Sequence, residues 1–97
     1  MAYYVYILRS LKDGRLYTGC GASVRERFEH HNHGGTQSTR HRRPLELVYV
    51  EEHLDKAIAM ARERRLKSLE GGGEKFRLVA EQTEEMIAET RRRWLDR

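Results

Sequence analysis

The feature that most constrains the fold is a hairpin signal near the N-terminus. Residues 3–9 read YYVYILR, a run of aromatic and β-branched side chains that is typical of a β-strand. An Asp13-Gly14 turn signal follows, and residues 16–19 (LYTG) have the character of a returning strand. A chain of 97 residues is one domain, so its fold has to be built around this antiparallel hairpin.

The hairpin brings two tyrosines to the same face of the sheet. A two-residue loop would pair Tyr6 with Gly21, whereas a four-residue loop would pair it with Gly19. In both registers Tyr6 and Tyr17 share a face, because side chains alternate along a strand. Their offset is about 14 Å in the first register and about 7 Å in the second, at about 3.4 Å per residue. Only the shorter offset lets the two phenols serve one site.

The residues after the hairpin predict a helix with a polar inner face. Ser23 and Glu26 match a capping box, and the helix should run to about Asn32 and stop at the glycine pair that follows. Four residues recur at helical spacing and form one stripe: Val24, Arg27, Phe28 and His31. Half of the stripe that should face the sheet is therefore Arg and His. A buried guanidinium needs polar partners, which makes this helix face unusual for a core.

A third strand and further helices are predicted downstream. Residues 36–44 form a polar, basic loop, and residues 45–50 (LELVYV) alternate as a strand. A helix should start at the N-cap Asp55, run to about Leu69 and close at the glycines 71–73.

Helical patterning resumes after Glu74 in two pieces that divide near Gln82 and Thr83. The element order is then β-β-α-β-α-α. This order predicts the α+β class, with a small three-stranded antiparallel sheet flanked by helices.

Charge and composition narrow the class of protein. Residues 1–50 hold eight Lys and Arg against four Asp and Glu, whereas residues 51–97 hold eleven of each sign. A basic half suggests an acidic partner such as nucleic acid, and a merely soluble basic protein is the alternative. No apolar run approaches the roughly 18 residues of a membrane span, and no signal peptide is visible. The single Cys20 favours a reducing setting, so we expect a cytoplasmic protein without membrane association.

Several motifs in order resemble one nuclease family. The triplet YVY at 4–6, the eleven-residue step to YTG at 17–19, and the Arg and His of the next helix resemble the GIY-YIG nuclease superfamily. The chain is most similar to the small stand-alone bacterial members related to the excision-nuclease C subunit and to Slx-type nucleases. The segments 38–52 and 61–68 extend the similarity over most of the chain. The resemblance implies the GIY-YIG endonuclease fold, with a nuclease-like domain over 1–80 and a helical extension over 81–97.

The resemblance also implies the site residues and their roles. Tyr6 and Tyr17 become the active-site tyrosines, Arg27 the catalytic arginine, His31 the helix histidine and Glu63 the metal-binding carboxylate. Such enzymes use one divalent cation, usually Mg²⁺ with Mn²⁺ as the alternative, and no small-molecule cofactor. The implied function is that of a DNA endonuclease or nickase acting in DNA repair, recombination or processing. A nucleic-acid-binding module with little activity and a protein-interaction domain are the alternatives.

Elementary chemistry agrees with these roles. Phosphodiester cleavage places negative charge on oxygens that a guanidinium or a hard cation stabilises. Arg27 and His31 lie four residues apart on the sheet-facing stripe, so both can reach the face that carries the tyrosines. A phenol held near an Arg or a metal should have a lowered pKa, which would suit it to take a proton from water. The role of Glu63 rests on the resemblance alone.

The loop STRHRRP predicts contacts with the phosphate backbone. It carries three arginines and two hydroxyl side chains, and Lys67 of the later helix is expected to extend the same surface; the predicted contact residues are Ser38, Thr39, Arg40, Arg42, Arg43 and Lys67. A solvated turn is the alternative. Phosphate contacts carry little sequence information, so tight sequence specificity is not expected. We expect a monomer or a weak dimer that binds DNA, with a protein partner for targeting.

Two conspicuous features carry no functional prediction. The histidine cluster HHNH at 30–33 lacks the Cys partners and the spacing of a structural zinc site. Cys20 has no accompanying Cys-His-Asx set and is interpreted as a small packing residue. The segment 83–97 is predicted to dock on its own core, to pair two chains or to touch DNA, and the sequence leaves these alternatives open.

Overall fold

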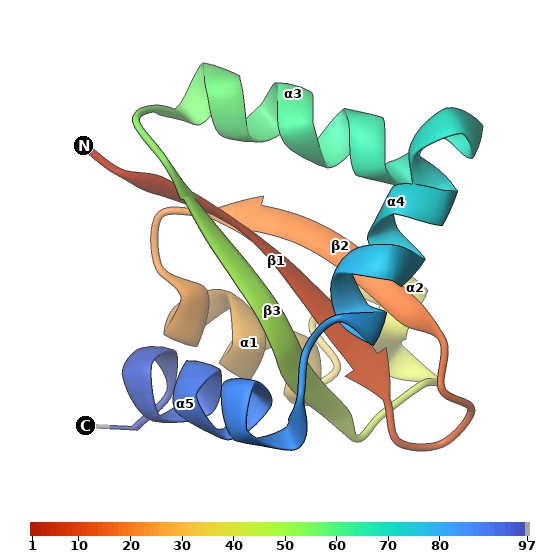
Figure 1. The fold of residues 1–97 in the computed structure, drawn as a ribbon. Helices are drawn as coiled ribbons and strands as arrows, with labels where there is room; N and C mark the ends of the chain where they lie inside the picture. Colours follow the sequence, from red (N-terminus) through yellow and green to blue (C-terminus); the bar gives the residue numbers. More distant parts are fainter. Residues whose placement is uncertain (97) are drawn as a thin grey trace.

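The computed structural model describes residues 1–96, and for residues 69–71 it describes the backbone alone. The elements along this part of the chain are β1 Tyr3–Ser10, β2 Leu16–Gly21, α1 Val24–Asn32, α2 Gln37–Arg40, β3 Leu45–His53, α3 Lys56–Lys67, α4 Leu69–Ala80 and α5 Glu84–Trp94 (Figure 1). The strands form one antiparallel sheet in the order β2-β1-β3. The predicted α+β class with a three-stranded antiparallel sheet is confirmed.

Helices cover both faces of this sheet. The helices α3 and α4 lie on one face and α1 lies on the other, while α5 packs along the edge strand β3 (Figure 1). The observed order differs from the predicted one in two places. The short helix α2 forms inside the segment predicted as a loop, and three helices follow β3, in agreement with the three predicted helical segments although the predicted order lists only two. No helix of the described part of the chain is long and apolar enough to cross a membrane.

Local capping signals decide where three helices begin. The Ser23 hydroxyl accepts a hydrogen bond from the Glu26 amide at 3.3 Å, which confirms the predicted N-cap of α1. Asp55 caps α3 through the Ile58 amide at 3.0 Å, also as predicted. Thr83 caps α5, and the break between the last two helices falls where the sequence predicts it.

The prediction that the glycines 71–73 close a helix is wrong. The helix α3 ends at Lys67, where Ser68 turns to extended backbone, and the glycines lie inside α4. Each interior glycine costs a helix about 1 kcal/mol relative to alanine. Packing of the following residues outweighs that cost, because Leu78 and Val79 of α4 join the core clusters beneath α3 and α4. The side chain of Leu69, the predicted last residue of α3, lies outside the described residues.

The structure selects one of the two hairpin registers. Tyr6 pairs with Gly19, as the four-residue loop requires. The turn is closed by the Gly14 amide, which donates to the Ser10 carbonyl at 2.9 Å, and Gly14 has a φ of +76° that favours glycine. Tyr17 pairs with the residue two positions beyond Tyr6 on β1. The two tyrosines therefore share a face at the shorter predicted offset, which permits a common site.

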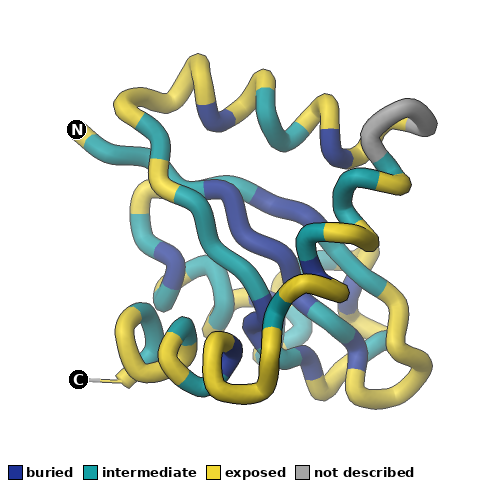
Figure 2. The backbone as a smooth tube through the Cα atoms, viewed as in Figure 1, coloured by how far each residue is buried: buried dark blue, intermediate teal, exposed yellow. Residues whose placement is uncertain are grey.

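The central strand is buried on both faces, and this organises the core (Figure 2). Four consecutive side chains of β1 are at most 1% exposed: Val5, Tyr6, Ile7 and Leu8. Tyr6 and Leu8 pack with Val24 of α1 on one face. Val5 packs with Ala59 and Leu66 of α3 on the other. A strand between two helical layers needs apolar residues on both sides, which explains its continuous apolar run.

The last helix completes the core. Ile87 of α5 packs with Ile7 and Val48 of the sheet. The Trp94 ring meets the Tyr4 ring edge to face, with 4.8 Å between their centroids. Of the three alternatives for the C-terminal segment, the described residues adopt docking on the chain's own core. Residue 97, the end of the predicted 81–97 extension, lies outside the described residues.

Candidate active site

A cluster of four polar side chains lies where β1, β2 and α1 meet. The Tyr6 hydroxyl, on a residue only 1% exposed, accepts a hydrogen bond from the Arg27 Nε at 3.3 Å. The same hydroxyl lies 3.1 Å from the His31 Nε2. The Tyr17 ring contacts the His31 ring edge to face, with a centroid separation of 4.9 Å. Tyr6, Tyr17, Arg27 and His31 thus come together in one cluster.

Two glycines of β2 make room for this cluster. A Cβ atom on Gly19 would lie 2.5 Å from the Tyr6 hydroxyl oxygen, and a Cβ atom on Gly21 would lie 2.6 Å from the Arg27 Cγ. Neither glycine has a positive φ, so backbone conformation does not require them. Instead, the absent side chains let the phenol of Tyr6 and the stem of Arg27 lie directly against the β2 backbone.

A threonine of α2 orients the buried His31 ring. The His31 Nδ1 lies 3.0 Å from the Thr39 Oγ1, and both residues are fully buried. Thr39 donates its hydroxyl proton to the Thr36 carbonyl at 3.4 Å, so its oxygen is left to accept from the His31 Nδ1–H. We assign the neutral Nδ1–H tautomer on this basis. The His31 Nε2 then carries a lone pair and accepts the Tyr6 O–H.

The burial of Thr39 corrects one site prediction. The sequence predicts that Thr39 contacts phosphate from the basic loop, but the short helix α2 turns its side chain inward, where it is 0% exposed. A hydroxyl without access to solvent cannot reach a DNA backbone in this conformation. Its contact with His31 makes Thr39 a positioning residue instead.

Burial controls the protonation of the two central groups. It raises the pKa of Tyr6 to about 12, and the hydrogen bond and charge of Arg27 only partly oppose that rise. Arg27 does act to lower the pKa of this phenol, but burial outweighs it, so the expected net lowering is wrong. Burial also lowers the pKa of His31 to about 4, assisted by the charges of Arg27, His30 and Lys67. At neutral pH the pair consists of a neutral phenol that faces a neutral imidazole.

Arg27 keeps its charge beside this pair. Its hydrogen bond to Tyr6 is the main cause that raises the pKa of the guanidinium above its ordinary value. Within the part of the chain that the structure describes, only the Nε of this guanidinium has a hydrogen-bond partner. The two terminal nitrogens remain available for an anion, and a phosphate matches their planar geometry.

Glu63 approaches the cluster from the other face of the sheet, around β2. One of its carboxylate oxygens accepts from the Cys20 thiol at 3.6 Å, and the other lies 3.3 Å from the Lys67 Nζ. That Nζ lies over the Tyr17 ring, 5.2 Å from its centroid. The carboxylate is thereby linked through Lys67 to Tyr17. The structure places it at the rim of the cluster without a direct hydrogen bond to Tyr6, Arg27 or His31.

The donor set at Glu63 suits a magnesium ion better than a zinc ion. No group of three or more His, Cys, Asp or Glu side chains able to hold a metal occurs among the described residues. Structural zinc needs four protein ligands, whereas Mg²⁺ is often held by one or two carboxylates together with water and substrate phosphate. Burial and the nearby Glu63 raise the pKa of Cys20, so the thiol is not poised as a thiolate ligand. Glu63 is the residue that could hold a cation here.

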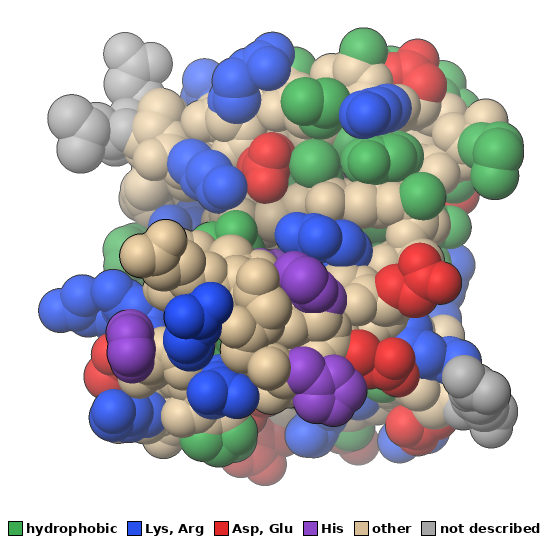
Figure 3. Space-filling view, turned by 180° about the vertical axis from the view of Figure 1, so that it is seen from behind, with side chains coloured by type: hydrophobic (Ala, Val, Ile, Leu, Met, Phe, Trp, Pro, Cys, Tyr) green, Lys and Arg blue, Asp and Glu red, His purple; other side chains and the backbone are tan. Residues whose placement is uncertain are grey.

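The basic segment lies on the surface beside the cluster. Arg40 and Arg43 are exposed, and each uses its Nε to bind a backbone carbonyl, of Gly34 at 3.0 Å and of Arg40 at 2.9 Å respectively. Arg42 is half-buried and lies 3.8 Å from an Asp13 carboxylate oxygen. Figure 3 shows Lys and Arg side chains gathered on this part of the surface, at its left. Ser38 is exposed on the same surface, and Lys67 is exposed on α3.

Comparison with known proteins identifies the family. A family model described as the GIY-YIG catalytic domain matches residues 2–76. The chain belongs to the GIY-YIG family. The predicted resemblance is thus confirmed, and a GIY-YIG domain implies nuclease-type function with DNA as the substrate.

The relatives of this GIY-YIG protein are chains of similar length. A UPF0213 protein of Natronomonas pharaonis is 45% identical over 82 residues, which are 84% of this chain and 94% of the relative. One from Staphylococcus saprophyticus is 39% identical over 80 residues, which are 81% and 95% of the two chains. The solution NMR structure of a UPF0213 protein from Bacillus halodurans is similar with a TM-score of 0.55 and 32% identity, covering 91% of this chain and 94% of that chain.

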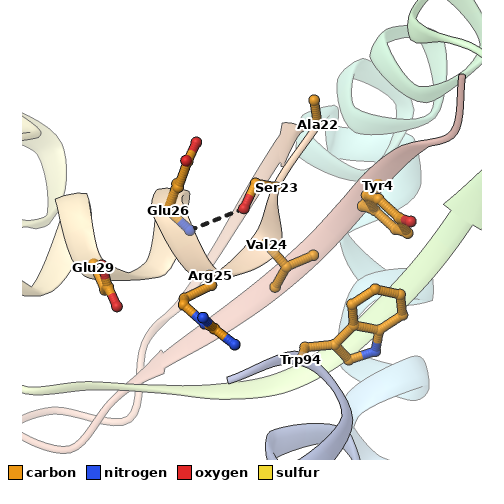
Figure 4. Close-up of a pocket in the computed structure, with 8 residues that line it drawn as sticks. All are labelled: Tyr4, Ala22, Ser23, Val24, Arg25, Glu26, Glu29 and Trp94. Carbon is orange, nitrogen blue, oxygen red and sulfur yellow. Dashed lines mark hydrogen bonds between the residues drawn. The ribbon is translucent and has the colours of Figure 1, made fainter. Parts of the chain in front are cut away.

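A separate cavity of about 430 Å³ marks where α5 meets α1 of this GIY-YIG domain (Figure 4). Tyr4 and Trp94 line it on one side, and Arg25 extends from α1 toward the C-terminal segment, where it donates to the Asp96 carbonyl at 3.4 Å. None of the five predicted catalytic residues lines this cavity. It belongs to the docking of the last helix and not to the candidate active site.

The sequence does not predict three residues that shape the candidate active site. From the sequence, Gly19 and Gly21 are only hairpin positions. In the observed register they lie opposite Tyr6 and Tyr4, where neighbouring side chains approach the β2 backbone closely. The sequence predicts Thr39 to be a hydroxyl residue on the surface. A helix over QSTR would have indicated that Thr39 is buried and Ser38 is exposed. Four residues are too few for helical periodicity to be recognised in the sequence.

Proposed function

We propose that this protein is a divalent-metal-dependent DNA endonuclease or nickase. The observation that carries the proposal is the Tyr6 hydroxyl, held between the Arg27 Nε at 3.3 Å and the His31 Nε2 at 3.1 Å. A buried oxygen that accepts from a cation and donates to a neutral base is suited to receive one proton while it releases another.

The proton path runs from water through Tyr6 to His31. A water molecule against the Tyr6 oxygen gives up a proton to it, while the phenol's own proton passes to the His31 Nε2. The resulting hydroxide attacks phosphorus, the bond from phosphorus to the leaving ester oxygen breaks, and solvent protonates that oxygen. The Tyr6 phenol with its pKa of about 12 is not a free phenolate base, so the neutral imidazole is needed as the final acceptor.

Arg27 stabilises the charge that develops during this attack. Its terminal nitrogens donate to non-bridging oxygens of the phosphate, which carry more negative charge in the transition state than in the substrate. The contact of its Nε with Tyr6 keeps the phosphate close to the oxygen that activates water. Arg27 is thus proposed as the catalytic arginine, with Tyr17 supporting the His31 ring through an edge-to-face contact.

Glu63 is proposed to hold the divalent cation, Mg²⁺ or Mn²⁺. When bound, the cation supplies Lewis acidity to the phosphate oxygens. The carboxylate is oriented by Cys20 and paired with Lys67, whose side chain is 46% exposed and can turn toward DNA. When the cation replaces Lys67 as the positive partner of Glu63, the negative charge of the carboxylate stays compensated.

Four cationic side chains and one hydroxyl side chain beside the site are proposed to contact the DNA backbone. These residues are Ser38, Arg40, Arg42, Arg43 and Lys67, which lie on α2, its following loop and α3. Contacts of this kind position DNA without reading its sequence. Their binding should weaken steeply with added salt, because each phosphate contact releases counterions.

A supercoiled-plasmid assay tests the proposal. We expect wild-type protein with Mg²⁺ or Mn²⁺ to nick or linearise the plasmid, and EDTA to abolish this. Arg27→Ala should lower the rate by about 10²–10³-fold, as loss of one charge-stabilising donor does in other enzymes. Glu63→Gln should be as severe, and the metal concentration for half-maximal activity should rise in any residual activity.

Matched controls separate the site from general charge effects. Arg92→Ala and Glu81→Gln change the same residue types at exposed positions outside the cluster, and both should cleave at the wild-type rate. A wild-type protein that binds DNA but leaves every substrate intact with either metal would instead identify a nucleic-acid-binding module that keeps the fold.

A further inference from the structure

A second cavity, of about 540 Å³, opens directly beside the candidate active site. Its walls come from the β1–β2 turn, the start of β2, α2 with its following loop, and α4; they are formed by Asp13, Gly14, Arg15, Leu16, Tyr17, Ser38, Arg42 and Phe76. Tyr17 lines this cavity and also contacts His31 in the catalytic cluster. A ligand in the cavity would therefore touch the site of the chemistry.

The cavity offers aromatic surface to solvent. Phe76 is 62% exposed, although other apolar residues of the same helix are buried, such as Val79 at 8%. What distinguishes Phe76 from the other exposed apolar side chains is its place in the wall of a cavity that Tyr17 also lines, where its ring is available to a ligand. Tyr17 adds a second ring to the lining of the cavity, and Leu16 adds further apolar surface.

Cations lie at the rim of this aromatic surface. The Arg15 side chain is 68% exposed and the Arg42 side chain is 35% exposed. A single acid, Asp13, lies 3.9 Å from the first guanidinium and 3.8 Å from the second, so the rim keeps a net positive charge. Apolar rings within reach of guanidinium groups complement a ligand that joins a flat base to a phosphate.

We infer that this cavity binds one unstacked nucleotide of the DNA strand, next to the phosphate that is cleaved. In an intact duplex both faces of each base are covered by neighbouring base pairs, so a ring such as Phe76 cannot stack on them. An unpaired nucleotide presents a free face, and stacking tolerates any base. The inference rests on the proposed nuclease function, and it extends that function to a preference for strands with unpaired nucleotides.

Binding measured in EDTA tests the inference without cleavage. The probes are a fluorescein-labelled single-stranded 12-mer and the blunt duplex of the same sequence, followed by fluorescence anisotropy. We expect Phe76→Ala to weaken binding of the single strand about tenfold, in the range of a lost base stack, with duplex affinity within about twofold of wild type. Phe76→Trp should retain the affinity, and Phe76→Leu should resemble Phe76→Ala because it lacks a ring face.

Ile58→Ala is the matched control, because Ile58 is an exposed apolar residue of α3, at 46%, that lies outside the cavity. It should bind both probes as wild type does. A 2-aminopurine base in the single strand should in addition be quenched by wild-type protein and not by Phe76→Ala. Equal losses on both probes, no loss, or wild-type affinity of Phe76→Leu would each overturn the inference.

The outcome is distinguishable from a failure of the proposed function. A protein that cleaves plasmid but shows no Phe76-dependent preference for the single strand would refute the nucleotide pocket and leave the nuclease intact. A protein that discriminates between the probes through Phe76 but cleaves nothing would retain the pocket and refute the nuclease. Absence of any DNA binding would refute both.

Discussion

Gly19 and Tyr6 face each other across the β1–β2 pair so closely that a methyl group on Gly19 would occupy the place of the phenol. A Cβ atom at this glycine would lie 2.5 Å from the Tyr6 hydroxyl oxygen and 2.6 Å from the ring carbon that carries it. The hydroxyl that contacts both Arg27 and His31 is thus located by the absence of a side chain on the neighbouring strand.

Substitution of Gly19 by Ala should displace the Tyr6 phenol and impair cleavage. We expect a loss of about 10²-fold in rate, since small misplacements of catalytic groups have effects of this size. Overpacking should also lower the free energy of unfolding by about 1–3 kcal/mol. Plasmid nicking and urea denaturation measure the two effects.

Gly73→Ala is the control for this substitution, because a Cβ atom on Gly73 meets no atom within 4 Å. In the interior of α4 it should stabilise the protein by about 1 kcal/mol and leave the cleavage rate unchanged. Unaltered cleavage by Gly19→Ala would show that the position of Tyr6 does not matter for the reaction.

Removal of the Thr39 hydroxyl should remove the preference of His31 for the Nδ1–H tautomer. In wild-type protein the ring nitrogens should report a protonated Nδ1 in two-bond ¹H–¹⁵N spectra, because the Thr39 oxygen accepts from it at 3.0 Å. Thr39→Val should shift the ring toward the Nε2–H form and slow cleavage by about 10- to 100-fold.

Thr39→Ser keeps the hydroxyl and should restore both the spectrum and the rate. The spectroscopic result does not depend on nuclease activity. An Nε2–H tautomer in the wild-type protein would contradict the proton path from Tyr6 to His31.

The stability of the protein should fall as the pH drops from about 6.5 to about 4. The folded state holds the pKa of His31 at about 4, below its ordinary value of 6.5, because the ring is buried. Between these values the unfolded chain binds a proton that the folded chain does not, and the free energy of unfolding decreases with falling pH.

His31→Gln should remove this part of the pH dependence, whereas the exposed control His41→Gln should keep it. Urea denaturation at pH 7 and pH 5 measures the difference. Glu51 does not obscure the comparison between pH 7 and pH 5, because its ordinary pKa is 4.5 and the stability that its lowered pKa contributes is lost only as the pH falls below about that value. Identical pH dependence in wild type and His31→Gln would refute the assignment.

Arg62 joins three elements on the sheet face opposite the cluster of Tyr6, Tyr17, Arg27 and His31. Its Nε donates to Glu51 of β3 at 2.6 Å, and one terminal nitrogen donates to Glu74 of α4 at 2.8 Å. Arg62→Met retains much of the stem but leaves both carboxylates without their main partner. We expect a loss of about 1.5–3 kcal/mol, because the two part-buried carboxylates lose a charged hydrogen-bond partner.

The control is Arg64→Met, an exposed arginine of the same helix, which should change stability by less than about 0.5 kcal/mol. Thermal or urea denaturation of the two variants gives the comparison. Equal stabilities would indicate that the Glu51–Arg62–Glu74 contacts add nothing to the packing of α3 on the sheet.

Elements that depend on neighbours in the chain were predictable from the sequence. The caps at Ser23 and Asp55 form through side chains that reach only three residues ahead. Alternation along a strand is equally local, and it is sufficient to place Tyr6 and Tyr17 on one face. The ordered motifs were then specific enough to indicate the GIY-YIG family, which the family model confirms.

Tertiary structure decided what depends on distant segments. Competing local signals allowed two hairpin registers, and the sheet selected the one that pairs Tyr6 with Gly19. The glycines after Ser68 are poor helix formers, but packing of the following residues keeps them helical. Burial of Thr39 and the approach of Glu63 around β2 likewise follow from contacts between segments far apart in the chain, and burial in turn sets the protonation of Tyr6 and His31. The sequence alone determined which side chains could form the site, whereas desolvation and packing in the folded protein determined what those side chains can do.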